Sequence, residues 1–549
     1  MVRPLHPSAH VDTFCRDNLP PRQQWPEFRF ELPELAYPER LNCAVALLDD
    51  VIAESGPDRP CLHAPGQTWS YGELRDQANR IARLLTEKHG LVPGNRVLLR
   101  GPNNPWLVAA WFGVLRAGGV VVTTMPLLRT EELETLAEIT GPALAVCDHR
   151  YRTELDPVGI PVLAYGSAEP DDLVAQCAAV APEFDPVETS SEDVALLAPT
   201  SGTTGRPKAT MHFHRDVLAN ADTFGRHIVG ADPADVYTGT PPLGFTFGLG
   251  GLVVFPLRFG AATLLLEKAS PAELADAIAE HGVSVLFTAP TAYKAMLAEG
   301  KAEQLRSLRR CVSAGEQLSE ALWREFRERT GIRIVDGIGA TEMLHVFISA
   351  AGDDIRPGST GRPVPGFVAT VLDLDGAEVP DGTPGQLAVK GPTGCRYLAD
   401  ERQRTYVRDG WNLTGDTYIR DAEGYFWYQA RSDDMIISSG YNIAGPEVEQ
   451  ALLRHPDVVD AAVIGEPDER RGHIVKAFVV LTEGVPGNEA KIGELQAHCK
   501  RVIAPYKYPR AIEFRAELPR TSNGKLQRYR LRSEAPAHQT PVPRAAPAN

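Results

Sequence analysis

Hydrophobic positions along the chain alternate between a helical spacing and short continuous runs. Residues 71–89 have the spacing of an amphipathic helix that Gly90 would end, and residues 96–100 form a short apolar run. The same pair recurs as a predicted helix over residues 105–117 and a β-branched strand over residues 120–124. Repeated units of this kind predict parallel sheets with helices on both faces.

Residues 261–290 contain the clearest unit of this type. A strand is predicted over residues 263–267, and Ser270 followed by Glu273 is the signature of a capped helix start. Gly282 ends that helix, and an apolar strand follows over residues 283–288. Because ligands in open α/β folds collect at the carboxyl ends of strands, functional residues are expected there.

The length and a change of pattern near residue 432 predict two domains. A chain of 549 residues exceeds the size of about 250–300 at which one core stops growing. We predict a large α/β domain of helix-covered sheets over residues 1–432 and a smaller α+β domain over residues 433–549. The first 40 residues should form an extended surface arm, and residues 533–549 a disordered tail. In the smaller domain we predict a helix over 446–453 and strands over 458–464 and 474–481.

Composition and charge narrow the expected partners and compartment. The chain is 43% hydrophobic, and its formal net charge of −15 disfavours nucleic acids and anionic membranes as partners. Its eight cysteines are scattered without a CxxC pair, which indicates free thiols in a reducing compartment. The most apolar region, residues 252–266, is interrupted by Pro256 and Arg258. We expect a cytoplasmic protein with no membrane span and no signal peptide.

A loop rich in glycine and hydroxyl groups ends at Lys208. Residues 200–208, TSGTTGRPK, suit the wrapping of phosphates by N–H and O–H donors. The loop is not a Walker A motif, because Lys208 lacks the preceding glycine and Pro207 stands where a helix should begin. A flexible surface turn is the alternative. The candidate phosphate-binding residues are Thr200, Ser201, Gly202, Thr203, Thr204, Gly205 and Lys208.

Three further segments offer chemistry of the same kind. Thr341 and Glu342 follow a predicted strand, and a hydroxyl beside a carboxylate at a strand exit suits a nucleotide site. Asp416 is predicted in a tight turn, where a carboxylate can accept two hydrogen bonds from ribose hydroxyls. Residues 518–525, LPRTSNGK, place Lys525 in a polar loop. Taken singly, each has an ordinary alternative: an exposed loop acid, a turn-capping aspartate or a solvated lysine.

Together, in this order and over nearly the whole chain, these segments resemble the acyl-adenylate-forming superfamily of acyl-CoA synthetases, peptide-synthetase adenylation domains and luciferases. The resemblance implies that Thr341 contacts the α-phosphate, Glu342 binds Mg²⁺ and Asp416 binds the ribose. Arg431 would contact the ribose or a phosphate, and Asp433 would be the hinge of the smaller domain. The implied nucleotide-binding set also includes Ser313, Ala314, Gly315, Glu316, Asp336, Gly337 and Ile338.

Lys525 matches the mobile catalytic lysine of the superfamily. Its ammonium would offset the repulsion between a carboxylate and the α-phosphate and stabilise charge on the phosphoryl oxygens. Gly440 and Tyr441 would line the channel for the pantetheine arm of coenzyme A. The implied reaction joins an acid to the thiol of coenzyme A through an acyl-adenylate, with ATP and Mg²⁺. The implied catalytic set is completed by Lys208, Thr341 and Glu342.

The acid pocket is expected to combine aromatic and small residues, as in a slot for a flat ring. Its phenylalanines would exclude long acyl chains, and ordinary core packing is the alternative for them. Within the superfamily the chain most resembles the aryl-CoA ligase branch, and residues 336–349 and 9–14 resemble its 2-aminobenzoate members. The expected pocket residues are Phe245, Thr246, Phe247, Gly315, Ile338, Gly339 and His345.

We expect 2-aminobenzoate as the acid, with His345 near its ortho edge. Phe247 stands where benzoate members tend to have tyrosine, which leaves para-hydroxy acids poorly supported as substrates and benzoate open. A buried structural role stays open for His345. An enzyme that loads a carrier protein is also open, although the Phe245–Thr246 pair lacks the aspartate of amino-acid-activating members. A non-catalytic acid sensor is opposed by the intact Lys208 and Lys525.

The smaller domain carries basic residues that are expected to receive the phosphates of coenzyme A, with solvated charge as the alternative. These residues are Arg470, Arg471, Lys500, Arg501, Lys507 and Arg510. Nothing in the sequence determines the oligomeric state, and a homodimer stays open.

Overall fold

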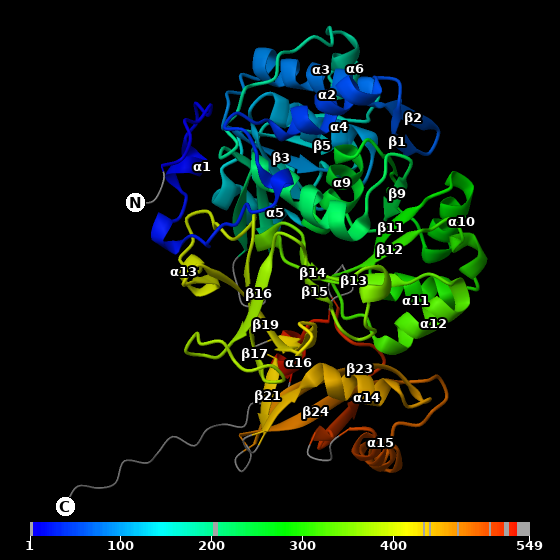
Figure 1. The fold of residues 1–549 in the computed structure, drawn as a ribbon. Helices are drawn as coiled ribbons and strands as arrows, with labels where there is room; N and C mark the ends of the chain where they lie inside the picture. The colour runs from blue at the N-terminus through cyan, green and yellow to red at the C-terminus, as the bar shows by residue number, and fades with distance from the viewer. Residues whose placement is uncertain are drawn as a thin grey trace, which may run out of the picture. The chain divides into compact units, whose positions relative to one another are not determined.

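The computed structural model describes residues 4–200, 207–431, 434–438, 441–468, 472–503, 507–520 and 526–534. The chain divides into two compact units, Met1–Tyr428 and Gln429–Asn549 (Figure 1). Sequence analysis put the boundary a few residues farther along, after residue 432. Within the described residues, no helix is long and apolar enough to cross a membrane.

A six-stranded sheet in the larger unit has the order β6-β5-β3-β4-β7-β8. All its pairs are parallel except β7–β8, and β3 and β4 are buried along their whole length. This burial is expected of strands that are covered on both faces. The strands are β3 (Arg96–Arg100), β4 (Val120–Thr124), β5 (Leu144–Asp148), β6 (Val162–Tyr165), β7 (Val194–Thr200) and β8 (Lys208–Phe213).

A nine-stranded sheet follows the order β15-β14-β13-β12-β11-β9-β10-β1-β2. Its central pairs are parallel, and the pairs at both ends are antiparallel. The largest buried cluster takes residues from both sheets, so the main core lies between them. The strands are β1 (Pro60–Ala64), β2 (Gln67–Ser70), β9 (Val236–Gly239), β10 (Ala262–Leu264), β11 (Val285–Thr288), β12 (Arg310–Ser313), β13 (Ile334–Gly339), β14 (Val346–Ser349) and β15 (Arg362–Pro363).

Helices cover these sheets, which confirms the predicted α/β class. Helices α10, α11 and α12 lie together beside β11–β13 (Figure 1) and share a second buried cluster. Helix α3 continues into a π-helical segment, Leu84–Lys88, that extends it almost to the predicted end. The helices are α2 (Cys43–Ser55), α3 (Tyr71–Arg83), α4 (Pro105–Arg116), α5 (Thr130–Thr140), α6 (Leu173–Ala178), α7 (His214–Asn220), α8 (Thr246–Leu249), α9 (Phe255–Arg258), α10 (Pro271–His281), α11 (Pro290–Ala298) and α12 (Glu320–Thr330).

The predicted capping signals operate as expected. Ser270 and Glu273 form a reciprocal capping box at the start of α10, and Gly282 ends that helix in a left-handed conformation with φ of 60°. Strands β10 and β11 are shorter than predicted. The apolar run continues beyond β10 because Leu265 is buried in the core, whereas the ladder ends earlier.

A third, antiparallel sheet corrects the prediction of a tight turn at Asp416. It consists of β16 (Val368–Leu372), β17 (Pro384–Lys390), β18 (Val407–Arg408), β19 (Trp411–Arg420) and β20 (Phe426–Arg431), with α13 (Gln403–Tyr406) before β18. Asp416 lies within β19, where the register against β17 is irregular. Gly415 adopts a φ of 74° there, so the chain bulges and the strand continues.

The arm at the start of the chain is mostly extended. Some of its side chains are buried in the larger unit, so it does not lie only on the surface. It contains short helices at α1 (Phe14–Asp17), Arg22–Gln24 and Pro33–Leu35. Cys15 is fully buried and Trp25 is 8% exposed. Buried side chains of this kind hold the arm to the larger unit.

The smaller unit is a five-stranded sheet with helices. Its core combines residues of α14, α15 and the sheet, which confirms the predicted α+β character. Both long strands extend beyond the predicted limits, and residues 533 and 534 belong to α16, so the first part of the predicted tail is helical. The elements are β21 (Met435–Ser438), β22 (Tyr441–Ala444), α14 (Gly445–Leu453), β23 (Val458–Asp468), β24 (Gly472–Leu481), α15 (Glu489–Val502), β25 (Ala511–Phe514) and α16 (Arg528–Glu534).

Candidate active site

Lys208 and Glu342 lie together although they are far apart in the sequence. The Lys208 Nζ atom is 3.2 Å from Glu342 Oε1, and both side chains are largely buried, with exposures of 14% and 10%. The Tyr397 hydroxyl donates a hydrogen bond of 2.5 Å to the same Oε1 and accepts one from Lys208. The Lys208 ammonium also lies 4.0 Å from the centre of the Tyr397 ring. A buried ion pair bridged by a hydroxyl therefore forms the polar centre of this site.

The turn that carries Thr341 and Glu342 is fixed from two sides. It is a 3-10 helix, Thr341–Met343, that follows β13. The imidazole of His212 in β8 lies 2.8 Å from the Thr341 carbonyl, and the Thr393 hydroxyl donates to the Met343 carbonyl at 2.8 Å. Because a carbonyl only accepts, Nε2 of His212 carries the proton. Burial lowers the pKa of His212 to about 3, so the ring is neutral at physiological pH.

Behind Tyr397, a buried arginine connects the site to the arm. Arg396 and Asp216 are fully buried and form an ion pair. The Arg396 guanidinium lies 4.0 Å from the Phe213 ring centre, 4.9 Å from that of Phe28 and 5.6 Å from that of Trp25. The aromatic residues of the arm thus enclose the residue next to Tyr397.

Ser313 ends β12, and Asp336 lies within the neighbouring parallel strand β13, near the edge where ligand sites of this fold are found. Strands β12 and β13 pair in a register that places these two residues opposite each other. Across the described residues, Oγ of Ser313 and Oδ1 of Asp336 are buried without a hydrogen-bond partner. Desolvation raises the pKa of Asp336 well above its usual value. Gly315, in the turn after β12, has a φ of 87°, a left-handed conformation that favours glycine.

Asp416 lies near the third sheet's other polar groups. The residue is 9% exposed, and its N–H donates to the Thr414 hydroxyl at 3.2 Å. Tyr418, two residues on, is buried beside Thr360 with the two hydroxyls 3.2 Å apart. Arg431 ends β20 and belongs to the smaller unit.

His345 is enclosed by four phenylalanines in the larger unit. The ring centres of Phe224, Phe247, Phe255 and Phe287 lie 5.4, 5.4, 4.6 and 6.2 Å from that of His345. The Nε2 atom is 3.4 Å from the Phe247 carbonyl, whereas Nδ1 is buried with no partner among the described residues. Burial lowers the pKa of His345 to about 3, so the ring is neutral and Nδ1 is available as an acceptor.

The pocket prediction identified only part of this aromatic enclosure. Phe247 and His345 belong to it, and Phe224, Phe255 and Phe287 were missed. Phe245 and Thr246 are half-buried at the start of α8. Ile338 and Gly339 end β13, before the turn that leads to His345.

Several predicted residues lie outside the described part of the chain. These are Ser201, Gly202, Thr203, Thr204, Gly205, Asp433, Gly440, Lys525, Arg470 and Arg471. Tyr441 begins β22, and its side chain is outside the description as well. In the smaller unit, Lys507 is paired with Glu447 at 2.6 Å, and Lys500 lies 4.0 Å from the Tyr508 ring centre.

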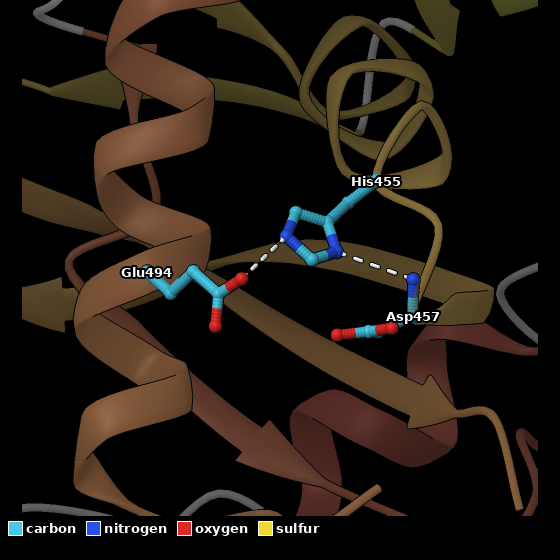
Figure 2. A group of neighbouring side chains, drawn as sticks. All are labelled: His455, Asp457 and Glu494. Atoms are coloured by element: carbon cyan, nitrogen blue, oxygen red, sulfur yellow. Dashed lines mark hydrogen bonds and ion pairs between the residues drawn. The ribbon is translucent and has the colours of Figure 1, made fainter.

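A second cluster of polar groups lies in the smaller unit (Figure 2). The His455 Nε2 atom is 3.1 Å from Glu494 Oε1, and the Asp457 N–H donates to Nδ1 of His455. These residues resemble a metal-ligand set. However, the Lys491 ammonium lies 2.6 Å from Asp457 Oδ2 and 2.6 Å from Glu494 Oε2. An ammonium of the protein therefore already contacts both carboxylates and offsets part of their charge.

Comparison with known proteins defines the class. Residues 50–397 match the family model of AMP-binding enzymes, and residues 447–525 match the C-terminal domain of the same enzymes. The chain therefore belongs to the AMP-binding enzymes, and it is an acid–thiol ligase, which confirms the expected resemblance.

Individual relatives share this architecture over almost their whole length. The benzoate–CoA ligase of Thauera aromatica is 36% identical over 91% of this chain and 97% of the relative. The crystal structure of the anthranilate CoA ligase AuaEII with anthranoyl-AMP is 32% identical, with a TM-score of 0.86, and covers 92% of this chain and 99% of its own. A benzoate CoA ligase structure from Burkholderia xenovorans LB400 is 31% identical, with a TM-score of 0.81, over 90% of this chain and 100% of its own.

Sequence reasoning missed Tyr397, His212 and Arg396. Each is separated in sequence from the residues that it contacts in the site, by 55 residues for Tyr397 and Glu342 and by 129 for His212 and Thr341. The segment around Tyr397, GCRYLAD, contains no spacing that indicates phosphate or metal chemistry. The only available signal was its position between two recognised motifs.

Proposed function

We propose that this ligase activates an aromatic carboxylate, with 2-aminobenzoate as the first candidate, and transfers it to coenzyme A. The observation that carries the proposal is His345, a neutral imidazole among four phenylalanines whose buried Nδ1 has no partner among the described residues. An ortho amino group is the hydrogen-bond donor that would satisfy this acceptor. The anthranilate and benzoate CoA ligases among the relatives support an aromatic acid.

The reaction has two steps. A carboxylate oxygen of the acid attacks the α-phosphorus of ATP and pyrophosphate leaves. The thiol of coenzyme A then loses its proton and attacks the carbonyl carbon of the mixed anhydride, and AMP leaves. The contribution of the protein is to position the reactants and to stabilise charge, with no covalent intermediate on a side chain.

The residues around Lys208 suit the first step. Lys208 would contact the leaving phosphates and Thr341 the α-phosphate, while Lys525 would stabilise charge as the adenylate forms. Glu342 fits a Mg²⁺ ligand because its largely buried carboxylate already accommodates a positive charge, the Lys208 ammonium at 3.2 Å. Mg²⁺, when bound, would neutralise charge on the phosphate oxygens.

We assign the rest of the nucleotide to residues of β12, β13 and β19. Asp336 and Ser313 would face the adenosine, where the buried Oδ1 of Asp336 can accept a hydrogen bond from an amino group. Asp416 in its bulge would accept from the ribose hydroxyls. Asp433 would serve as the hinge and Gly440 would adjoin the thiol channel.

The test compares four acids: 2-aminobenzoate, benzoate, 4-hydroxybenzoate and a medium-chain fatty acid. AMP release is measured with and without coenzyme A. Fast, CoA-dependent turnover of 2-aminobenzoate is the expected result. Adenylate that coenzyme A cannot discharge would indicate a carrier protein as acceptor, and preference for the fatty acid would contradict the aromatic pocket.

A variant separates the ortho hypothesis from the choice of ring. His345→Phe keeps an aromatic ring but removes the acceptor nitrogen. The proposal predicts that the kcat/KM for 2-aminobenzoate falls about tenfold more than that for benzoate, which is the effect of one lost hydrogen bond of about 1.4 kcal/mol. Equal losses for both acids would assign His345 to packing alone.

A further inference from the structure

We propose that Tyr397 is a positioning residue for metal-dependent ATP binding. Its hydroxyl holds the Glu342 carboxylate by one oxygen and keeps Lys208 from replacing the metal. The inference rests on the proposed assignment of Glu342 to Mg²⁺. It goes beyond that assignment because it concerns a residue that contacts neither the acid nor the reacting phosphate in the proposed reaction.

One hydroxyl satisfies both charged partners. The Tyr397 Oη atom donates to Glu342 Oε1 at 2.5 Å and accepts from the Lys208 ammonium, which itself lies 3.2 Å from the same Oε1. Both interactions with the carboxylate therefore fall on Oε1. A carboxylate held by one oxygen cannot rotate freely, so its second oxygen keeps a fixed direction toward a cation. Hydrogen bonds of this kind commonly orient carboxylates that bind metals.

The environment of Tyr397 favours this role over simple core packing. The Tyr397 hydroxyl donates directly to Glu342 Oε1, so its one proton is engaged by the carboxylate. The Tyr397 N–H is held by Gln403 Oε1 at 2.8 Å, and the preceding Arg396 is fixed by Asp216. The ring thus approaches the ion pair from a rigid segment.

The arrangement also explains how two cations can use one carboxylate in succession. Lys208 and Mg²⁺ carry the same sign of charge, so the ammonium must withdraw from Glu342 as the metal arrives. The Tyr397 hydroxyl shares the ammonium with Glu342 and weakens the direct contact. Without that hydroxyl, Lys208 would bind Glu342 alone and oppose the metal.

The experiment measures equilibrium binding of a non-hydrolysable ATP analogue to the full chain by calorimetry, with Mg²⁺ and with EDTA. The variants are Tyr397→Phe, Glu342→Gln and, as the matched control, Tyr71→Phe. Tyr71 is fully buried and donates to the Ala261 carbonyl at 2.8 Å, so its variant also loses one buried hydroxyl. Melting temperatures are measured for all variants.

Tyr397→Phe should lose about tenfold or more of the affinity gained from Mg²⁺, since substitutions of groups that support a metal ligand typically cost about 10- to 100-fold in metal affinity. Its affinity in EDTA should change by less than about twofold, and Tyr71→Phe should keep the full Mg²⁺ gain. An equal loss with and without Mg²⁺ would overturn the inference, because a purely structural tyrosine would produce it.

The variants distinguish this inference from the function on which it rests. If Tyr397→Phe keeps the Mg²⁺ gain while Glu342→Gln loses it, the role of Tyr397 is wrong and the metal assignment stands. If Glu342→Gln also keeps the gain, the assignment of Glu342 itself is wrong.

Discussion

Gly250 lies so close to His345 that a methyl group cannot be added without moving the imidazole. A Cβ atom at Gly250 would lie 2.4 Å from Cδ2 and 2.8 Å from Nε2 of His345, and 3.1 Å from Cζ of Phe255. Ordinary contact begins near 3.4 Å, so in the Gly250→Ala variant the ring must move by the difference, 1.0 Å. Phenylalanine rings enclose the imidazole, so the movement is expected to be toward the space proposed for the acid.

The expected cost follows from overpacking. An extra methyl in a well-packed core typically costs about 1–3 kcal/mol. If this whole free-energy cost appears as weaker binding of the acid, the KM for the aromatic acid rises about 5- to 150-fold, since about 1.4 kcal/mol corresponds to a factor of ten. The KM for ATP should change less, because Lys208 and Asp416 lie on β8 and β19, which contain neither Gly250 nor His345.

The assay measures pyrophosphate release at saturating ATP with 2-aminobenzoate and with benzoate. Gly225→Ala is the matched control, because its Cβ would lie 3.4 Å from both Phe255 Cγ and Phe259 Cε2, which is ordinary contact. If Gly250→Ala keeps the KM for both acids within about twofold while its melting temperature falls by several degrees, the core absorbs the strain. The placement of His345 beside the acid would then be refuted.

Three further results are expected. Arg396→Leu should lower the free energy of unfolding by about 3–5 kcal/mol because it removes the closer ion-pair partner of the buried Asp216 and leaves only Arg215, at 3.9 Å. Adding Asp216→Leu should recover part of the loss in urea denaturation, and no recovery would contradict pairing as the cause. Burial lowers the pKa of His212 and His345 from 6.5 to about 3, so the stability they contribute is complete above pH 6.5 and is lost as pH falls toward 3. Over this pH range the melting temperature should therefore fall more steeply in the wild type than in His345→Phe. Parallel curves of melting temperature against pH would refute this. At the cluster of His455, Asp457 and Glu494, the Lys491 ammonium lies between the two carboxylates, where a metal ion would otherwise bind. EDTA should therefore leave the melting temperature unchanged. A drop in EDTA that zinc or calcium reverses would contradict this.

Sequence reasoning succeeded where the determining interactions are local. The capping box of α10 involves residues three positions apart, and the strands β3 and β4 were predicted because buried parallel strands require continuous apolar runs. The motif around Thr341 and Glu342 could be proposed for the same reason, since its residues are adjacent, and the roles of the two residues stay predictions. The turn predicted at Asp416 was wrong because Gly415 permits a bulge as well as a turn, and pairing with β17 decides between them.

The sequence by itself thus determined the α/β class, the positions of most helices and strands, the membership of the AMP-binding enzymes and the residues of each motif. Only the tertiary structure decided that Tyr397 joins Lys208 to Glu342 across separations of 189 and 55 residues. It also decided that three unrecognised phenylalanines enclose His345. The physical reason is that such contacts depend on how the sheets and loops pack, and a chain's local pattern records burial and capping but not the identity of a distant neighbour.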